Sequence, residues 1–344
     1  MKYIYSPSYP SLRLICYFIH QGEDITVISH NQDIIKLCLQ LNWPCIPFNF
    51  KVKGQPKIRE CWNLFKIIRF KRELQELFNE ISDQCKQGIL YYTISGIDVL
   101  GMDIISRFAT QRQDLNVTYW PEDNRKPGKE VFFQSIESWI YKYYCNLLYK
   151  PMFRYELHND GVFIVVRRSF ISKYHINEIE IPGIYGMDVY QRLPRDFMHA
   201  DYLLLGGYSI EMDDKIYVAR DLLDIYEFIK GLYPNVYYKP HPGAVKLDSY
   251  FDDYKIYPSH IPAEFLADNL GVVVGAASAS LAPLARKGVR CISVLDLVGT
   301  REGFSKQFWK DKMTSDSEGT VLFPQSRDEL KNYLFEPLSN SNCS

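Results

Sequence analysis

Several common features are missing from this sequence of 344 residues, and each absence excludes a class of protein. The eight cysteines are scattered singly, without a CxxC motif or a close His/Cys pairing, which excludes a disulfide framework and a zinc site of the usual spacing. Basic and acidic residues number 40 and 41, so no excess charge draws the whole protein to nucleic acid. We therefore expect reduced thiols and no nucleic-acid partner, and any anion site must come from a local arrangement.

Long apolar runs are missing as well. No segment reaches the ~20 uninterrupted apolar residues that a membrane span needs, and the opening MKYIYSPSYPSLRL lacks the pattern of a signal peptide. No internal repeat or low-complexity segment stands out, apart from a polar tail at 336–344. These features predict a cytoplasmic protein that is either soluble or attached only at the surface of a membrane, on the inner face of the plasma membrane.

What is present is an alternation of strands and helices that runs twice along the chain. It begins at KYIYS and restarts at ADYLLLGGYS after a stretch with little periodicity. Such alternation is typical of α/β proteins with parallel, Rossmann-type sheets. Because the chain exceeds the size at which a single core keeps growing, we predict two Rossmann-like domains, 1–175 and 199–335, joined by a linker at 176–198.

A long amphipathic helix is predicted from Pro56 onward, and its first half is rich in Lys and Arg. Two interpretations of the basic stretch at 57–78 stay open. It contacts an anionic membrane surface, or it is a solvated helix that packs on the sheet.

Three loops in the second half follow predicted strands. They are Gly206–Ser209, Lys239–Gly243 and Gly275–Ser280. In an open α/β sheet, ligands bind beyond the carboxyl ends of the strands. We therefore expect these loops at one edge of one sheet, with Gly207 and Tyr208 among the ligand-binding residues.

The second loop belongs to VYYKPHPG, which places a histidine between two prolines. Pro240 and Pro242 fix φ on either side of His241, so a stiff backbone holds the imidazole. Lys239 and His241 then offer N–H donors to a phosphate, the lysine as a point charge and the histidine to an oxygen that gains charge as a bond breaks. A lone histidine is more often structural, but a rigid loop at the ligand edge favours a functional one.

Two further features lie near this loop in the sequence. Ser278 and Ser280 precede a predicted helix, where free backbone N–H groups favour an anion, although a serine at this place can also be a plain N-cap. In SHIPAEFLADN, Glu264 lies in the first turn of a short helix that follows Pro262. Its carboxylate either binds a ribose diol or complements the helix dipole.

Taken in order, YKPHPG, SHIPAEFLADN and GVVVGAASASL resemble the bacterial sialyltransferases of GT-B type and the related polysialyltransferases of capsule synthesis. The resemblance covers about the last third of the chain, and the first half only in architecture. It implies two Rossmann-like domains that face each other across a cleft, an acceptor-side domain followed by a nucleotide-sugar-binding domain. It also implies inverting transfer of sialic acid from CMP-sialic acid, without a metal or another cofactor.

The resemblance implies roles for individual residues. His241 contacts the donor phosphate and assists the departure of CMP, beside Lys239, Pro242 and Gly243. Glu264 holds the ribose. Paired hydroxyl residues bind phosphate in these enzymes, but here Ser278 and Ser280 alternate with alanines, so either serine can be the one that faces the phosphate.

The general base of these enzymes lies in an acidic-acidic-glycine motif after a strand of the first domain. The best match is Glu122–Asp123–Asn124 after LNVTYWP, where asparagine replaces glycine. Because asparagine tolerates a left-handed φ, the same turn is possible here. Glu122 or Asp123 then takes the proton from the acceptor hydroxyl. The rival Asp160, in HNDG, fits a hairpin turn better.

The partners expected are a CMP-activated sugar and a glycan acceptor, lipid-linked or not, of a cell-surface polysaccharide or lipooligosaccharide. Two alternatives stay open. The same site suits transferases of Kdo or pseudaminic acid and CDP-glycerol-type transferases, because nothing in the sequence recognises the sugar itself. The protein can also be an inactive nucleotide-sugar-binding subunit of a capsule assembly complex, since fold alone does not give activity.

Overall fold

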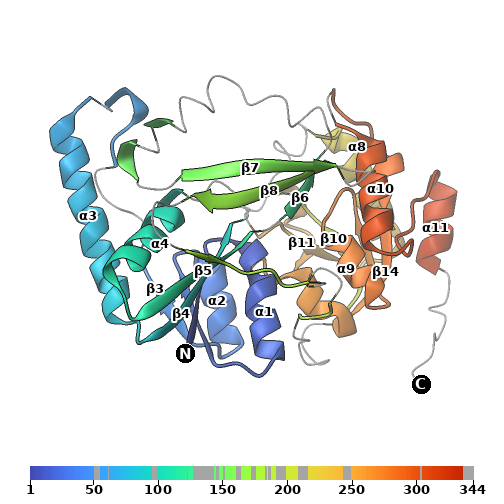
Figure 1. The fold of residues 1–344 in the computed structure, drawn as a ribbon. Coiled ribbons are helices and arrows are strands. Elements are labelled where there is room, and N and C mark those ends of the chain that lie inside the picture. The colour runs from blue at the N-terminus through green and yellow to red at the C-terminus, as the bar shows by residue number, and fades with distance from the viewer. Residues whose placement is uncertain are drawn as a thin grey trace. The chain divides into compact units, whose positions relative to one another are not determined.

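Two parallel sheets carry most of the strands of the structure, which is a computed structural model (Figure 1). The chain divides into two units, Met1–Val189 and Tyr190–Ser344. The structure describes residues 1–49, 55–60, 62–94, 99–121, 123–126, 143–144, 147–149, 152–159, 164–171, 176–182, 184, 187–190, 199–207, 216–242, 249–302 and 304–335. For 58, 94, 99, 123–126, 152–159 and 164–171 it describes the backbone alone.

The sheet of the first unit has the strand order β3-β2-β1-β4-β5-β9, and all its pairs are parallel. Its strands are short and rich in Tyr, Ile and Val, as expected for strands covered on both faces. Their bounds are β1 (Lys2–Tyr5), β2 (Ile25–Ser29), β3 (Cys45–Pro47), β4 (Gly88–Ile94), β5 (Leu115–Pro121) and β9 (Asn177–Glu178).

Helices connect the strands of this sheet and bury an apolar stripe against it. The core joins strand tyrosines, such as Tyr5 and Tyr92, to helix residues such as Phe70 and Phe108. The helical elements are η1 (Tyr9–Ser11), α1 (Leu12–His20), α2 (Gln32–Gln40), η2 (Ile58–Glu60), α3 (Leu64–Asp83) and α4 (Val99–Gln111).

The predicted long helix begins later than its periodicity indicates. Asn63 caps α3, because its side chain accepts a hydrogen bond from the backbone N–H of Lys66 at 3.1 Å. An asparagine in extended conformation at this position ends the preceding turn and starts the helix. Residues 58–60 form the separate turn η2.

A three-stranded antiparallel sheet completes the first unit, in the order β6-β8-β7. Its strands are β6 (Asp123–Lys126), β7 (Met152–Asn159) and β8 (Ile164–Ile171). The hairpin predicted around HNDG, after Pro151, is confirmed by the antiparallel pairing of β7 and β8, although its turn lies outside the described residues. The turn that was possible at Asn124 is not formed, because this residue pairs with Val166 of β8 as part of an extended strand. The backbone groups of β8 complete their hydrogen bonds there, which a tight turn would prevent.

The second unit repeats the design of the first. Its parallel sheet has the order β12-β11-β10-β13-β14. The strands are β10 (Ala200–Leu205), β11 (Tyr237–Lys239), β12 (Lys255–Ile256), β13 (Leu270–Gly275) and β14 (Arg290–Ser293). The helical elements are α8 (Ala219–Leu232), η3 (Ser249–Phe251), η4 (Ala263–Asn269), α9 (Leu281–Arg286), η5 (Val294–Asp296), α10 (Lys306–Asp316) and α11 (Arg327–Phe335).

Numbered along the chain within each unit, the first five strands of both sheets follow the Rossmann order 3-2-1-4-5. The predicted α/β class and the two Rossmann-like units are therefore confirmed. The units meet in sequence between Val189 and Tyr190, inside the predicted linker 176–198, and the first part of that linker forms β9 of the first sheet. The tail at 336–344 lies outside the described residues.

Candidate functional site

The three loops predicted to form the site do begin at one edge of the second sheet. β10, β11 and β13 run parallel, and Leu205 at the end of β10 is in register with Lys239 at the end of β11. β10, the first strand of the unit, lies between β11 and β13. The chain adds β11 and β12 on one side of β10 and then β13 and β14 on the other side, so the strand order reverses its direction at β10. This is the topological switch point at which ligands bind in such sheets.

Backbone hydrogen bonds tie the first loop to the second. The N–H of Gly206 donates to the carbonyl of Lys239 at 2.8 Å, and the N–H of His241 donates to the carbonyl of Gly207 at 3.3 Å. A Cβ at position 206 would lie 1.9 Å from the Tyr238 hydroxyl oxygen, so this close approach requires glycine. The stiffness predicted from the two prolines is therefore reinforced by the neighbouring strand.

Lys239 is buried at this edge, with 4% of its surface exposed. Its ammonium donates to the carbonyls of Pro240 at 3.4 Å and Ser259 at 3.3 Å. The lysine thus connects the histidine loop to the segment that leads into η4. Its direct contact with a phosphate stays a prediction.

The imidazole of His241 is held neutral. Burial, followed by the positive charge of Lys239, lowers the pKa of His241 from 6.5 to about 4. At neutral pH the ring therefore has one N–H donor and one acceptor nitrogen. Both causes penalise the cationic form. The negative charge of a phosphate bound beside the ring would favour that form and would therefore raise this pKa again.

The serine loop is held by other hydrogen bonds. The Ala277 N–H donates to the Tyr217 hydroxyl at 3.3 Å, and the Ser293 hydroxyl donates to the Ala276 carbonyl at 2.8 Å. The Ser278 hydroxyl accepts from the Ser280 N–H at 3.4 Å in a local turn. Ser280 occupies the N-cap of α9, but among the described residues its side chain makes no capping hydrogen bond. Both serines are half-buried. Their contact with a phosphate, by either hydroxyl, stays a prediction.

Glu264 is the second residue of η4, as the sequence predicts, and is half-buried. Its backbone carbonyl accepts a hydrogen bond from the Lys287 ammonium at 3.0 Å, which joins η4 to the end of α9. Among the residues that the structure describes, its carboxylate has no hydrogen-bond partner. A ribose diol is one partner that would satisfy it, and this role stays a prediction.

Other predicted residues are not placed by the structure. Tyr208, Gly243, Glu122 and Asp160 lie outside the described residues. Asp123 is described by its backbone alone, in β6 opposite Arg167 of β8. The structure therefore brings together Gly207, His241 and Lys239, and leaves the predicted bases untested.

Sequence reasoning missed Tyr217, which supports the serine loop. This buried tyrosine forms a β-bridge with Thr300 and packs edge-on against Phe304, with ring centroids 5.5 Å apart. A bridge across more than eighty positions leaves no local signal in the sequence. The missed helix α10 follows the same segment, and its capping residue Ser305 accepts from the Phe308 N–H at 3.2 Å.

A second histidine lies at the corresponding edge of the first sheet. His30 follows β2, the second strand of that sheet, as His241 follows β11, the second strand of its own. The Nδ1 atom of His30 is 3.2 Å from the Tyr5 hydroxyl, and its ring centroid is 5.3 Å from that of Phe48. Burial lowers the pKa of His30 from 6.5 to about 4.

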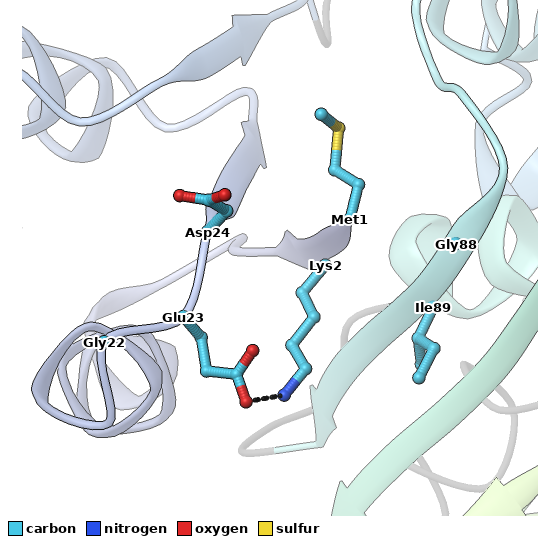
Figure 2. Close-up of a pocket in the computed structure, with 7 residues that line it drawn as sticks. All are labelled: Met1, Lys2, Gly22, Glu23, Asp24, Gly88 and Ile89. Carbon is cyan, nitrogen blue, oxygen red and sulfur yellow. Dashed lines mark ion pairs between the residues drawn. The ribbon is translucent and has the colours of Figure 1, made fainter.

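A pocket lies at the opposite edge of the first sheet, at the amino ends of β1, β2 and β4. Figure 2 shows Lys2 and Glu23 pointing toward one another beside it, with 2.8 Å between the ammonium and a carboxylate oxygen. The lining residues are Met1, Lys2, Gly22, Glu23, Asp24, Gly88 and Ile89. None of them is a predicted site residue, and ligands of such sheets bind at the other edge.

Among the described residues, no group of three or more His, Cys, Asp or Glu side chains is arranged to hold a metal ion. The described cysteines at positions 16, 38, 45, 85 and 291 form no disulfide with one another. In the part of the chain that the structure covers, no helix combines the length and the apolar character that a membrane crossing requires.

Neither a family model nor a curated protein matches the sequence. Solved structures do resemble the chain over almost its whole length. UDP-GlcNAc 2-epimerase from Methanocaldococcus jannaschii is 13% identical, with 99% of this chain and 94% of the other covered and a TM-score of 0.46. The glycotransferase of kitacinnamycin is 11% identical, with 99% and 90% covered and a TM-score of 0.43. The glycosyltransferase SnogD from Streptomyces nogalater is 9% identical, with 98% and 91% covered and a TM-score of 0.43. At such identities and scores, these proteins indicate neither the substrate nor the activity of this chain.

Proposed function

We propose that this protein is an inverting, metal-independent glycosyltransferase that moves sialic acid, or a related nonulosonic acid, from a CMP-activated donor to a glycan acceptor. The observation that carries the proposal is the rigid His241 loop, hydrogen-bonded to Gly206 and Gly207 at the switch point of a Rossmann-type sheet. The order of the HP, proline-acidic and serine motifs around this edge supports the choice of CMP as the nucleotide. The acceptor in this proposal is a cell-surface polysaccharide or lipooligosaccharide, glycosylated in the cytoplasm.

The donor end of the reaction rests on His241. In the transfer, the bond between the anomeric carbon and the phosphate oxygen breaks, and CMP leaves with the bonding electrons. The neutral imidazole donates its N–H to a phosphate oxygen, and this hydrogen bond strengthens as the oxygen gains negative charge. The buried Lys239 adds a fixed positive charge close to the same loop.

The serine loop and Glu264 position the rest of the donor. The hydroxyls of Ser278 and Ser280 offer further donors to the phosphate, and the carboxylate of Glu264, which has no hydrogen-bond partner among the described residues, accepts from the ribose hydroxyls. In this proposal the nucleotide binds to the second unit.

The acceptor end needs a base. An acceptor hydroxyl oxygen attacks the anomeric carbon from the side opposite CMP, and its proton passes to the carboxylate of Glu122 or Asp123. Attack from that side inverts the configuration at the anomeric carbon. Changing both residues to alanine should abolish transfer while CMP still binds, as measured by product formation and by calorimetry. Near-normal transfer by the double variant would place the base elsewhere.

A nucleotide screen tests the proposal most directly. The purified protein is heated with CMP, CDP, UDP, TDP or GDP, because a ligand that binds the native state raises the apparent Tm. We expect CMP to give the largest increase. Stabilisation by UDP or TDP without an effect of CMP would overturn the choice of donor, and a selective effect of CDP would favour a CDP-glycerol-type transferase.

Donor hydrolysis then separates an enzyme from an inactive subunit. CMP-sialic acid, CMP-Kdo and CMP-pseudaminic acid are each incubated with the protein without an acceptor, and released CMP is measured. We expect release from CMP-sialic acid. Binding of CMP without hydrolysis or transfer of any donor would make the protein a nucleotide-sugar-binding subunit.

A further inference from the structure

Large apolar side chains gather at the amino-terminal end of α3, which Figure 1 shows as the outermost helix of the first unit. Of the eleven that are exposed among the described residues, four fall within 62–68. Their exposed fractions are 87% for Trp62, 69% for Leu64, 87% for Phe65 and 66% for Ile68. Single exposed apolar residues are ordinary, but a concentration of this kind marks an interaction surface.

The packing of α3 on its own unit does not use these side chains. The helix buries a stripe that recurs every three or four residues, made of Ile67, Phe70, Leu74, Phe78 and Ile81. Leu64, Phe65 and Ile68 lie off that stripe. The amino-terminal half of the helix thus has one apolar face in the core and a second one exposed.

Basic and acidic residues are concentrated in different parts of residues 57–83. Residues 57–72 contain six basic residues and one acidic residue, whereas 73–83 contain four acidic residues and no basic one. Some of the basic side chains have local partners, since Lys66, Arg69 and Arg72 form ion pairs with Glu60, Glu73 and Glu76. Arg59 and Lys71 have no ion pair among the described residues.

Basic side chains border the exposed apolar face. Arg69 lies four residues after Phe65, and Arg72 lies four residues after Ile68, so each pair shares one side of the helix. The two arginine side chains are 76% and 82% exposed. Long basic side chains beside apolar ones suit a boundary between acyl chains and charged headgroups.

We propose that residues 57–72, which we call the α3 entry segment, dock the protein on an anionic lipid membrane. Trp62, Leu64 and Phe65 enter the headgroup region, and the basic side chains contact lipid phosphates. The acidic half of α3 faces away from the surface, which orients the helix with its amino end toward the lipid. A second copy of this chain is the poorer occupant, because it would bring a like-charged segment against this one. The proposal stands independently of the proposed transferase activity.

Vesicle sedimentation tests the proposal. The full-length protein is spun with vesicles of phosphatidylcholine alone and of phosphatidylcholine mixed with phosphatidylglycerol. We expect binding to the mixed vesicles only, and its loss at high salt. The double variant Trp62→Ser/Phe65→Ser should bind at least about tenfold more weakly, since two large apolar side chains no longer leave water. Arg59→Gln/Lys71→Gln should weaken binding about fivefold for each residue changed.

Matched variants outside the α3 entry segment test whether the loss of any exposed apolar or basic side chain weakens vesicle binding. Leu39→Ser removes an apolar side chain that is 69% exposed on α2, and Arg220→Gln/Lys86→Gln removes two exposed basic residues elsewhere. Both should bind the mixed vesicles like the wild type. Circular dichroism spectra and Tm values equal to those of the wild type show that the entry-segment variants remain folded. Because this control does not use donor hydrolysis, failure of the docking proposal and failure of the transferase proposal stay distinguishable.

A quenching measurement locates the contact. Brominated lipids in the mixed vesicles should quench tryptophan fluorescence of the wild type, and Trp62→Phe should lose most of that quenching while still binding. Equal binding to neutral and anionic vesicles, or no binding by the folded wild type, would overturn the proposal. So would self-association that Trp62→Ser/Phe65→Ser abolishes in the absence of vesicle binding, because the segment would then be an interface between copies.

Discussion

His30 and His241 occupy corresponding places in two sheets of the same strand order, and their pKa values are lowered alike, to about 4. Their surroundings differ. His30 is hydrogen-bonded to Tyr5 and packed against Phe48, and burial alone lowers its pKa. His241 lies between two prolines, and the charge of Lys239 adds to the effect of burial. A lowered pKa alone therefore does not indicate which of the two histidines serves a ligand, and the prediction for His241 depends on the groups beside it.

Turnover should separate the two histidines most strongly. If His241 stabilises the departing phosphate, His241→Ala should lower kcat by about 10²–10³, as loss of one donor to a developing negative charge does. His30→Ala should lower the Tm and leave transfer close to that of the wild type. The two variants are compared by initial rates with CMP-sialic acid and by thermal melts. Equal losses of turnover would show that the first sheet also supplies a catalytic group.

Without a ligand, His30 and His241 should contribute equally to the pH dependence of the free energy of unfolding. Each has a folded-state pKa near 4, below the usual 6.5, so the unfolded chain takes up protons first as the pH falls. Stability is therefore fully present above pH 6.5 and is lost as the pH falls toward 4. Denaturant melts should show this slope, and His30→Gln and His241→Gln should each flatten it.

Binding of CMP should change the pKa of His241 and leave the pKa of His30 unchanged. If CMP places its phosphate beside His241, the negative charge raises the pKa of the imidazole, so CMP binding at pH 5–6 should take up a proton, visible by calorimetry in buffers of different ionisation enthalpy. The uptake should vanish in His241→Gln and persist in His30→Gln. Uptake that survives in His241→Gln would place the phosphate elsewhere.

The regular elements could be predicted from the sequence, because their signals are local. Alternating strands and helices, the hairpin after Pro151 and the loops at the carboxyl edge all follow from periodicity and turn residues over short windows. The strand order and the register were not accessible in this way, since they depend on pairs such as Leu205 and Lys239. Asn63 is a typical N-cap residue and so indicates where α3 begins. The strong apolar periodicity of the segment before it made an earlier start look favourable.

The site was predictable as a set of loops and not as a set of contacts. Nothing local in the sequence shows that Lys239 is buried and donates to the Ser259 carbonyl, twenty residues later. The turn that was possible at Asn124 is not formed for a similar reason, because pairing with a distant strand outweighs the tolerance of asparagine for a turn. In both cases the local structure depends on pairing with residues that are distant in the sequence.

The smallest expected effect concerns the tyrosines that support the two edges. Tyr217→Phe removes the acceptor of the Ala277 N–H in the serine loop, and Tyr5→Phe removes the hydroxyl that contacts His30. Each should cost about 1 kcal/mol of stability, as a lost hydrogen bond of a partly buried group does. If the serine loop binds the donor phosphate, only Tyr217→Phe should also weaken CMP binding, by about fivefold for a bond of that strength. Calorimetric titration of both variants with CMP decides this. Equal affinities would mean that the loop does not depend on Tyr217 to present its backbone, and the phosphate contacts would then rest on the His241 loop alone.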